Sequence, residues 1–322
     1  MRNLPGLPCE EVASSPKLPA VTKRTLCLLI LAVSLSGCAR ATISRGEPSP
    51  ESPEVPSAAV TAPAERIPSA SPAAKPVSQP KEGLGPIIPA LKEYPVGEEL
   101  EYEISWLGVP VGLVTITVSE TTDVDGPLKG LRKLSCVGRS NKYLETFYPV
   151  LIQLTSYVDP QTGSPRRFEA SVKRRKRKHE SFITFDPVQK TAFHKLPKRK
   201  SATVPVSEKT QDWISLIYYS RTLPFRVGQE VPLEVTSDGK NWHLTGQILR
   251  AGKVDLRGLR AWQAFEGQLQ LAYPVPFFEG AKAFVWFSAD EHRIPLLAKI
   301  KSAIGPVSVV LTRRGSSSSS NL

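Results

Sequence analysis

The sequence predicts an all-β domain: a strongly bent antiparallel sheet or open barrel with one short helix, a β-sandwich being the alternative. Two observations lead to this prediction. Between residues 93 and 312, polar and apolar residues alternate in many short runs separated by turn residues. One segment in this region instead follows the 3.6-residue period of a helix.

The strands are predicted from the alternation, which is clearest at residues 99–106. There Leu100, Tyr102, Ile104 and Trp106 are separated by polar residues, as in a half-buried strand. Residues 107–112 are predicted as a turn, and the Thr/Val-rich segment 113–119 as the returning strand. The same pattern predicts further strands at 132–139, 150–158, 167–176, 179–186, 190–196, 230–237, 241–250, 259–271, 281–288, 293–303 and 306–312.

The helix is predicted at residues 213–221, where apolar residues recur at helical spacing. Asp212 can cap its N-terminus, and Pro224 ends the run. We expect about three turns packed against the sheet. Asp212 and Arg221 are interpreted as architectural residues that could pair between helix and sheet.

The N-terminal region has the features of an export signal. Lys23 and Arg24 precede the uncharged run 25–37, which is shorter than the roughly 20 apolar residues of a membrane span. The run ends in Leu35, Ser36, Gly37 and Cys38, which resemble the lipobox of bacterial lipoproteins. A buried strand that ends in Cys is the alternative.

The lipobox resemblance implies that residues 1–37 are a cleaved signal peptide recognised through Leu35, Ser36 and Gly37. It also implies that Cys38 carries the acyl chains, such as palmitate, because several chains anchor a protein stably. Residues 1–20 fit a leader poorly, so Val21 is an alternative start. Ala39, in place of the Asp that retains many lipoproteins in the inner membrane, favours the outer membrane facing the periplasm.

Two segments are predicted to be disordered. Residues 38–92 begin with the lipidated Cys and are rich in Pro, Ser and Ala, a composition with too little apolar surface to fold. Fully extended, fifty such residues would span on the order of 150 Å, so this segment is a tether. Residues 313–322, with five consecutive Ser, form the second segment.

Three blocks of the β region resemble the bacterial family called domain of unknown function 3108. They are 96–102 with the turn to Gly112, 212–228, and 286–295 with Gly305. The resemblance implies an exported protein and brings no known activity or catalytic residue. A looser architectural likeness to the half-barrel lipoprotein carriers of the periplasm assigns no function, because one fold serves many functions.

Positive charge is concentrated in one segment of the predicted domain. The chain carries a net charge of +12, and residues 166–200 contain 13 Lys and Arg against three acidic residues. They should form a basic hairpin for an anionic lipid, lipopolysaccharide or polysaccharide, since clustered cations gain roughly 1 kcal/mol each near an anionic surface. The alternative is an edge hairpin whose charges prevent association. Nucleic acid is not an expected partner of an exported protein. The candidate binding residues are Lys173, Arg174, Arg175, Lys176, Arg177, Lys178, Lys198, Arg199 and Lys200.

Motifs for catalysis, metal or cofactor binding are not found in the sequence, so we expect no enzyme. Cys136 on a predicted strand is typical of a buried small residue. The four His have no metal-ligand spacing. A hydrolase would require Asp290, His292 or His243 to converge in a cleft. Phe277 and Phe278, in a Pro-rich loop, either fill the core or contact an apolar ligand.

We therefore expect a membrane-anchored envelope lipoprotein that binds an amphipathic or anionic component of the envelope. The alternative is a structural or assembly protein that acts through protein contacts. The state of the interior distinguishes the two. A lipid-sized cavity is required by the first function, and a core filled with side chains favours the second.

Overall fold

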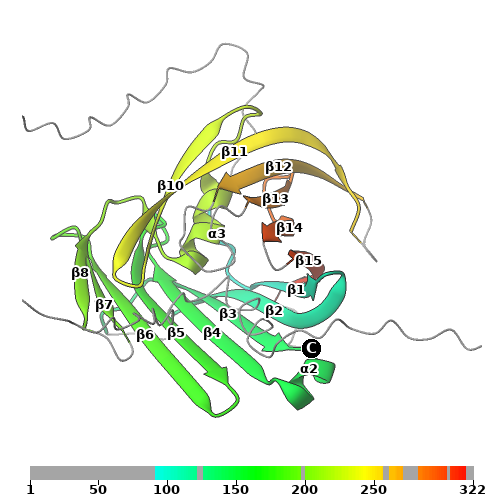
Figure 1. The fold of residues 1–322 in the computed structure, drawn as a ribbon. Coiled ribbons are helices and arrows are strands. Elements are labelled where there is room, and N and C mark those ends of the chain that lie inside the picture. Colours follow the sequence, from blue (N-terminus) through cyan, green and yellow to red (C-terminus); the bar gives the residue numbers. More distant parts are fainter. Residues whose placement is uncertain are drawn as a thin grey trace, which may run out of the picture.

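The computed structural model describes residues 91–121, 126–196, 200–256, 261–270, 282–302 and 305–316. The predicted signal peptide, the lipobox and most of the predicted tether lie outside the described residues. Fifteen strands form one sheet, which bends around a helix on its concave side (Figure 1). No helix in the described ranges has the length and apolarity that crossing a bilayer requires.

The sheet contains two runs of antiparallel strands that meet at the first and last strands of the domain. The first run comprises β1 (Glu98–Trp106), β2 (Val109–Glu120), β3 (Arg132–Ser140), β4 (Val150–Val158), β5 (Pro165–Arg174), β6 (Arg177–Asp186), β7 (Thr191–Lys195) and β8 (Ala202–Pro205). The second comprises β10 (Glu230–Ser237), β11 (Lys240–Val254), β12 (Trp262–Gln270), β13 (Lys282–Ser288), β14 (Pro295–Ser302) and β15 (Gly305–Ser316). β1 pairs with β15, and the short β9 (Thr210–Gln211) runs parallel to β10.

The predicted fold class is confirmed: the described residues of the domain are nearly all-β, with one bent, unclosed sheet and two short helices. α3 (Trp213–Thr222) agrees with the predicted helix. The Asp212 carboxylate accepts from the N–H groups of Ile214 and Ser215, and the Ser215 hydroxyl accepts from the Asp212 N–H. This capping box starts the helix, and Leu223 is extended, as the residue before a proline prefers.

Several local features differ from the predictions. The six-residue helix α2 (Lys142–Phe147) and the short strands β8 and β9 were not expected, because segments this short carry no measurable periodicity. The first turn is only Leu107 and Gly108, both with positive φ, as a tight hairpin requires. β15 continues to Ser316, into the segment expected to be disordered.

Side chains, rather than strand pairing, connect the two margins of the sheet. His194 on β7 lies 3.0 Å from the Thr236 hydroxyl on β10, and its Nδ1 accepts from the Gly239 N–H at 3.2 Å. The Asn241 amide on β11 donates to the Pro205 carbonyl on β8. The bent sheet is therefore held nearly closed by hydrogen bonds between β7–β8 and the β10–β11 hairpin; the contact of His194 with Thr236 is buried, and that of Asn241 with Pro205 is exposed.

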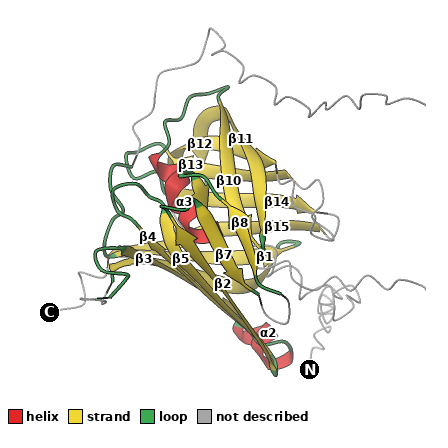
Figure 2. Ribbon diagram, turned by 90° about the vertical axis from the view of Figure 1, so that its left-hand side faces the viewer, coloured by secondary structure: helices red, strands yellow, loops and turns green. Residues whose placement is uncertain are grey.

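The sheet has two ends, which we name after the helices. The α2 end carries α2 and the β1–β2, β5–β6, β10–β11 and β14–β15 turns, as the strand registers require. The α3 end carries the β13–β14 turn and the start of β1, next to Arg221 of α3. Figure 2 shows α2 at the lower end of the strands, away from α3.

Candidate functional site

An apolar cavity of about 290 Å³ lies inside the bent sheet, between α3 and the strands that face it. It reaches the α3 end, where Val231, Phe287 and Pro295 lie within one position of strand ends. It also extends toward the α2 end, where lining residues on five strands lie within two positions of the strand ends. These five are Ile104, Gly138, Ile152, Leu269 and Ile300. From α3, the lining residues are Ile214, Leu216, Ile217 and Ser220.

Glycines in the middle of strands help to create this space. Gly138, Gly246 and Gly267 line the cavity from β3, β11 and β12. A Cβ atom placed on each would have its nearest neighbours at 3.5, 3.6 and 3.6 Å, which are ordinary contact distances. Glycine is thus not required by crowding at these positions, although it weakens strands. The effect of these glycines is that no side chain projects into the cavity at their three positions.

The hydroxyl groups at the cavity wall are already satisfied by the protein. The Tyr102 hydroxyl donates to the Pro295 carbonyl at 3.0 Å, and the Ser220 hydroxyl to the Ile217 carbonyl at 2.7 Å. Burial raises the pKa of the Cys136 thiol to about 12, so the thiol is neutral near pH 7. The cavity therefore presents an almost wholly apolar surface, of the kind that stays dry and takes apolar ligands.

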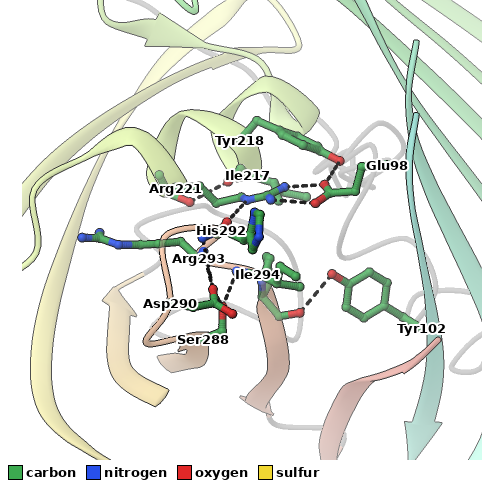
Figure 3. Close-up of polar contacts among 12 residues, drawn as sticks. Glu98, Tyr102, Ile217, Tyr218, Arg221, Ser288, Asp290, His292, Arg293 and Ile294 are labelled. Carbon is green, nitrogen blue, oxygen red and sulfur yellow. Dashed lines mark hydrogen bonds and ion pairs between the residues drawn. The ribbon is translucent and has the colours of Figure 1, made fainter. Parts of the chain in front are cut away.

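A buried polar cluster joins α3 to β1 at the α3 end (Figure 3). Arg221 donates to both carboxylate oxygens of Glu98, at 2.7 and 2.8 Å, and the Tyr218 hydroxyl donates to the same carboxylate at 3.1 Å. Burial opposes the charge on Arg221, but the contacts with Glu98 prevail and raise its pKa. Burial raises the pKa of Tyr218, and the Glu98 carboxylate adds to the effect.

The β13–β14 turn joins the same cluster through backbone carbonyls. Arg221 Nε donates to the His292 carbonyl at 3.0 Å, and Arg293 donates to the Leu223 carbonyl at 2.7 Å. Asp290 accepts from the Ser288 hydroxyl at 2.7 Å and stabilises the turn itself. The cluster therefore attaches the end of α3 to two distant parts of the sheet.

Asp212 and Arg221 serve architecture, as interpreted from the sequence, but they do not pair with each other. Asp212 caps α3 and accepts a 2.6 Å hydrogen bond from Ser156 on β4, while Arg221 binds Glu98. They sit at opposite ends of a ten-residue helix, so each contacts a different strand. Burial raises the pKa of Asp212, against the effect of its hydrogen bonds.

The residues considered for hydrolysis lie at different places. Asp290 and His292 belong to the β13–β14 turn at the α3 end, whereas His243 is exposed on β11 near the β10–β11 turn. Within the described ranges, no three His, Cys, Asp or Glu side chains gather as metal ligands would.

The basic segment forms the tip of the β5–β6 hairpin. In the strand register, Arg174 of β5 lies opposite Arg177 of β6, and Arg175 and Lys176 form the turn between them. Arg175 donates to the Phe147 carbonyl at 2.9 Å and stacks over the Tyr148 ring at 5.1 Å, and Lys178 pairs with Glu180 at 2.6 Å. Lys200 is exposed before β8. Lys198, Arg199, Phe277 and Phe278 lie outside the described residues.

Sequence reasoning missed two features of this site. The pairing of Glu98 with Arg221 could not be inferred, because the alternating pattern of β1 places Glu98 at its edge and names no partner. The cavity had a usable signal, namely glycines at positions that alternate with polar residues along predicted strands, such as Gly246 and Gly267.

The fold and cavity define the class of protein: a bent β-sheet that wraps a helix and encloses an apolar space. The family described as protein of unknown function (DUF3108) matches residues 101–312, so this chain belongs to that family. The three sequence blocks that resembled the family supply the buried cluster of Glu98, Arg221 and the β13–β14 turn.

Comparisons with curated proteins and with solved structures add little further. No curated protein matches the chain. A β-barrel-like protein of domain of unknown function DUF1849 from Brucella abortus is 12% identical, with a TM-score of 0.45 over 70% of this chain and 98% of that chain. A protein from Bacteroides fragilis, titled as exported and of YmcC-like fold, is 9% identical, with a TM-score of 0.29 over 71% and 98%.

Proposed function

We propose that this protein binds an apolar chain of an amphipathic cell-envelope molecule in the cavity inside its bent sheet. The observation that carries this proposal is the cavity itself, whose 290 Å³ lie near the lower limit of ligand sites, roughly 300 Å³. An interior filled with side chains would have favoured the alternative, an assembly protein.

An apolar chain fits the cavity better than a polar ligand does. The hydroxyls of Tyr102 and Ser220 donate to backbone carbonyls, so they are engaged within the protein. Each methylene buried against the apolar wall contributes about 0.8 kcal/mol. A polar head group gains nothing inside, so it belongs at the α2 end, which the cavity approaches and where the basic hairpin lies.

The cellular setting of the proposal comes from the sequence. The predicted signal peptide and lipidated Cys38 support a lipid-anchored envelope protein at the outer membrane, facing the periplasm. The Pro-rich segment before residue 93 would then tether the domain to that membrane. In this setting the available ligands are membrane lipids and lipopolysaccharide.

The test is native mass spectrometry of the full chain purified from a bacterial envelope, followed by lipid extraction. We expect one bound amphiphile per chain. The Gly246→Phe variant should lose it, because the added ring occupies the cavity. Gly252→Phe is the matched control, since Gly252 lies on the same strand and a Cβ there has no atom within 4 Å.

The variants also need a check on folding, because an added ring can strain a packed interior by about 1–3 kcal/mol. Circular dichroism and thermal unfolding serve this purpose, and Gly267→Leu provides a smaller replacement on the neighbouring strand. An empty wild-type chain would contradict the proposal. So would equal lipid content in the folded Gly246→Phe and Gly252→Phe variants.

A further inference from the structure

We propose that the α2 end docks on an anionic lipid bilayer, with the aromatic side chains of α2 entering the head-group region and the β5–β6 turn contacting phosphates. This inference rests on the proposed function, because docking would bring the part of the cavity at the α2 end close to a lipid surface. The surface, which we call the docking rim, consists of α2 with the β1–β2 and β5–β6 turns.

Two aromatic side chains of α2 point into solvent. Tyr143 is 85% exposed and Phe147 is 74% exposed. They are four residues apart, so they share one face of the helix. Leu144, on another face, packs against the buried cluster of Ile104, Trp106, Val111 and Val307. The helix is thus attached through Leu144 and leaves its two aromatics free for another surface.

Specific contacts hold this short helix in place at both ends. The Asn141 side chain accepts from the Leu144 N–H at 2.9 Å and donates to the Pro110 carbonyl at 2.6 Å. At the other end, Arg175 of the basic turn donates to the Phe147 carbonyl at 2.9 Å. A helix of six residues does not persist alone, so these contacts fix the position of the aromatics. They also place the basic turn directly beside them.

Charged side chains surround the aromatic pair. Lys142 on α2 and Lys176 and Arg177 on the β5–β6 hairpin are exposed. Within the described part of the chain, Lys176 and Arg177 have no carboxylate at ion-pair distance. On α2 itself, the exposed Glu145 offsets the charge of Lys142. The excess of positive charge beside the aromatic pair therefore comes from the β5–β6 turn.

Apolar residues of the neighbouring turn extend the rim. Leu107 and Val109 are each 48% exposed at the β1–β2 turn. That turn is tied to α2, because Asn141 donates to both the Pro110 and Val111 carbonyls. Figure 1 shows α2 and the tip of the β5–β6 hairpin at the same edge of the molecule. The rim thus combines exposed apolar groups with unpaired cations on one rigid support.

This combination fits a membrane interface. Aromatic rings settle at the boundary between head groups and acyl chains, and each nearby Lys or Arg gains about 1 kcal/mol at an anionic surface. Free phosphate would engage the cations but leave the aromatics exposed. An anionic bilayer accounts for both.

The test places a fluorescent reporter on the rim of the full chain. The Phe147→Cys variant is labelled with an environment-sensitive dye and reconstituted into phosphatidylglycerol or phosphatidylcholine vesicles. The matched control is Val188→Cys, because Val188 is 88% exposed on the β6–β7 turn at the α3 end. Unsubstituted chain treated in the same way measures labelling of the other cysteines.

We expect a blue shift for the dye at position 147 in phosphatidylglycerol only, with no shift at position 188. High salt should abolish the shift, because it screens exposed charges. The shift should also be lost in a Lys176→Ser, Arg177→Ser background. No shift at 147 in phosphatidylglycerol, or equal shifts at 147 and 188, would overturn the proposal. A shift at 147 only when another envelope protein is added would assign the rim to a protein partner and also overturn it.

Docking and cavity binding can fail separately. A shift at position 147 with an empty cavity in native mass spectrometry would support docking and contradict the proposed ligand. A bound lipid without any shift would support the ligand and contradict docking.

Discussion

Arg221 near the end of α3 donates two hydrogen bonds to Glu98 at the start of β1, although 123 residues separate them in the chain. Both side chains are almost completely buried, and the nitrogen–oxygen distances are 2.7 and 2.8 Å. Removing one member of such a pair leaves the other charge buried without compensation. The pair therefore attaches α3 to the sheet more by the cost of breaking it than by its net contribution to stability.

The first prediction concerns this ion pair. Arg221→Met should destabilise the domain by about 3–5 kcal/mol, because the Glu98 carboxylate stays buried without its partner. Glu98→Leu combined with Arg221→Met should recover much of the loss, since no charge remains. Urea unfolding of the full chain measures both variants. Arg313→Met, at an exposed pair with Glu101, is the control and should have little effect. Equal losses for the single and double variants would contradict this account.

The second prediction concerns the effect of pH on His194, which joins the two margins of the sheet through Thr236 and Gly239. Burial lowers the pKa of His194 to about 4, against about 6.5 in an unfolded chain. Below pH 6.5 the unfolded chain therefore binds a proton that the folded one excludes. The contribution of neutral His194 is complete above pH 6.5 and is lost as the pH falls toward 4. It amounts to on the order of 3 kcal/mol.

Comparison with His194→Gln isolates this effect, because carboxylates titrate in both proteins. Urea unfolding at pH 7.5, 5.5 and 4.5 should show the wild type losing more stability than the variant between the first and last values. Equal losses of stability in the two proteins would contradict the prediction that protonation of His194 weakens the contact between the margins of the sheet.

The third prediction separates glycines that enlarge the cavity from those that the backbone requires. Gly267→Ala should be neutral or stabilising by up to about 1 kcal/mol, because its Cβ meets Ile248 at 3.6 Å and alanine reduces unfolded-state entropy. Gly112→Ala should be destabilising, since its Cβ would lie 2.7 Å from the Arg139 carbonyl oxygen. Thermal unfolding measures the stability of each variant relative to the wild type. Destabilisation by Gly267→Ala comparable to that by Gly112→Ala would show that the cavity wall is packed.

The fourth prediction uses the thiol in the cavity wall. Burial raises the pKa of Cys136 to about 12, and the thiolate is the reactive form. The native full chain at pH 7.5 should leave Cys136 unmodified by iodoacetamide, whereas the urea-unfolded chain should react. Peptide mass spectrometry distinguishes Cys136 from the other cysteines. Rapid native modification would place the thiol in contact with water and contradict an enclosed apolar wall.

Much of the fold could be predicted, because strand and helix periods are local. The alternation at 99–106 predicted β1, and Asp212 with Pro224 bounded α3 correctly. α2 and β9 escaped prediction, since six and two residues are too few to display a period. The aromatic pair of α2 was missed with it, although the neighbouring basic hairpin was predicted.

The sequence by itself determined the all-β class, the position of α3, and the clustering of charge at residues 173–178. These depend on neighbours in the chain. Only the tertiary structure decided that Glu98 meets Arg221 and that Gly138, Gly246 and Gly267 face a common space. The physical reason is that such contacts depend on the register and bending of strands far apart in sequence, and local composition does not encode which inward faces lie opposite each other.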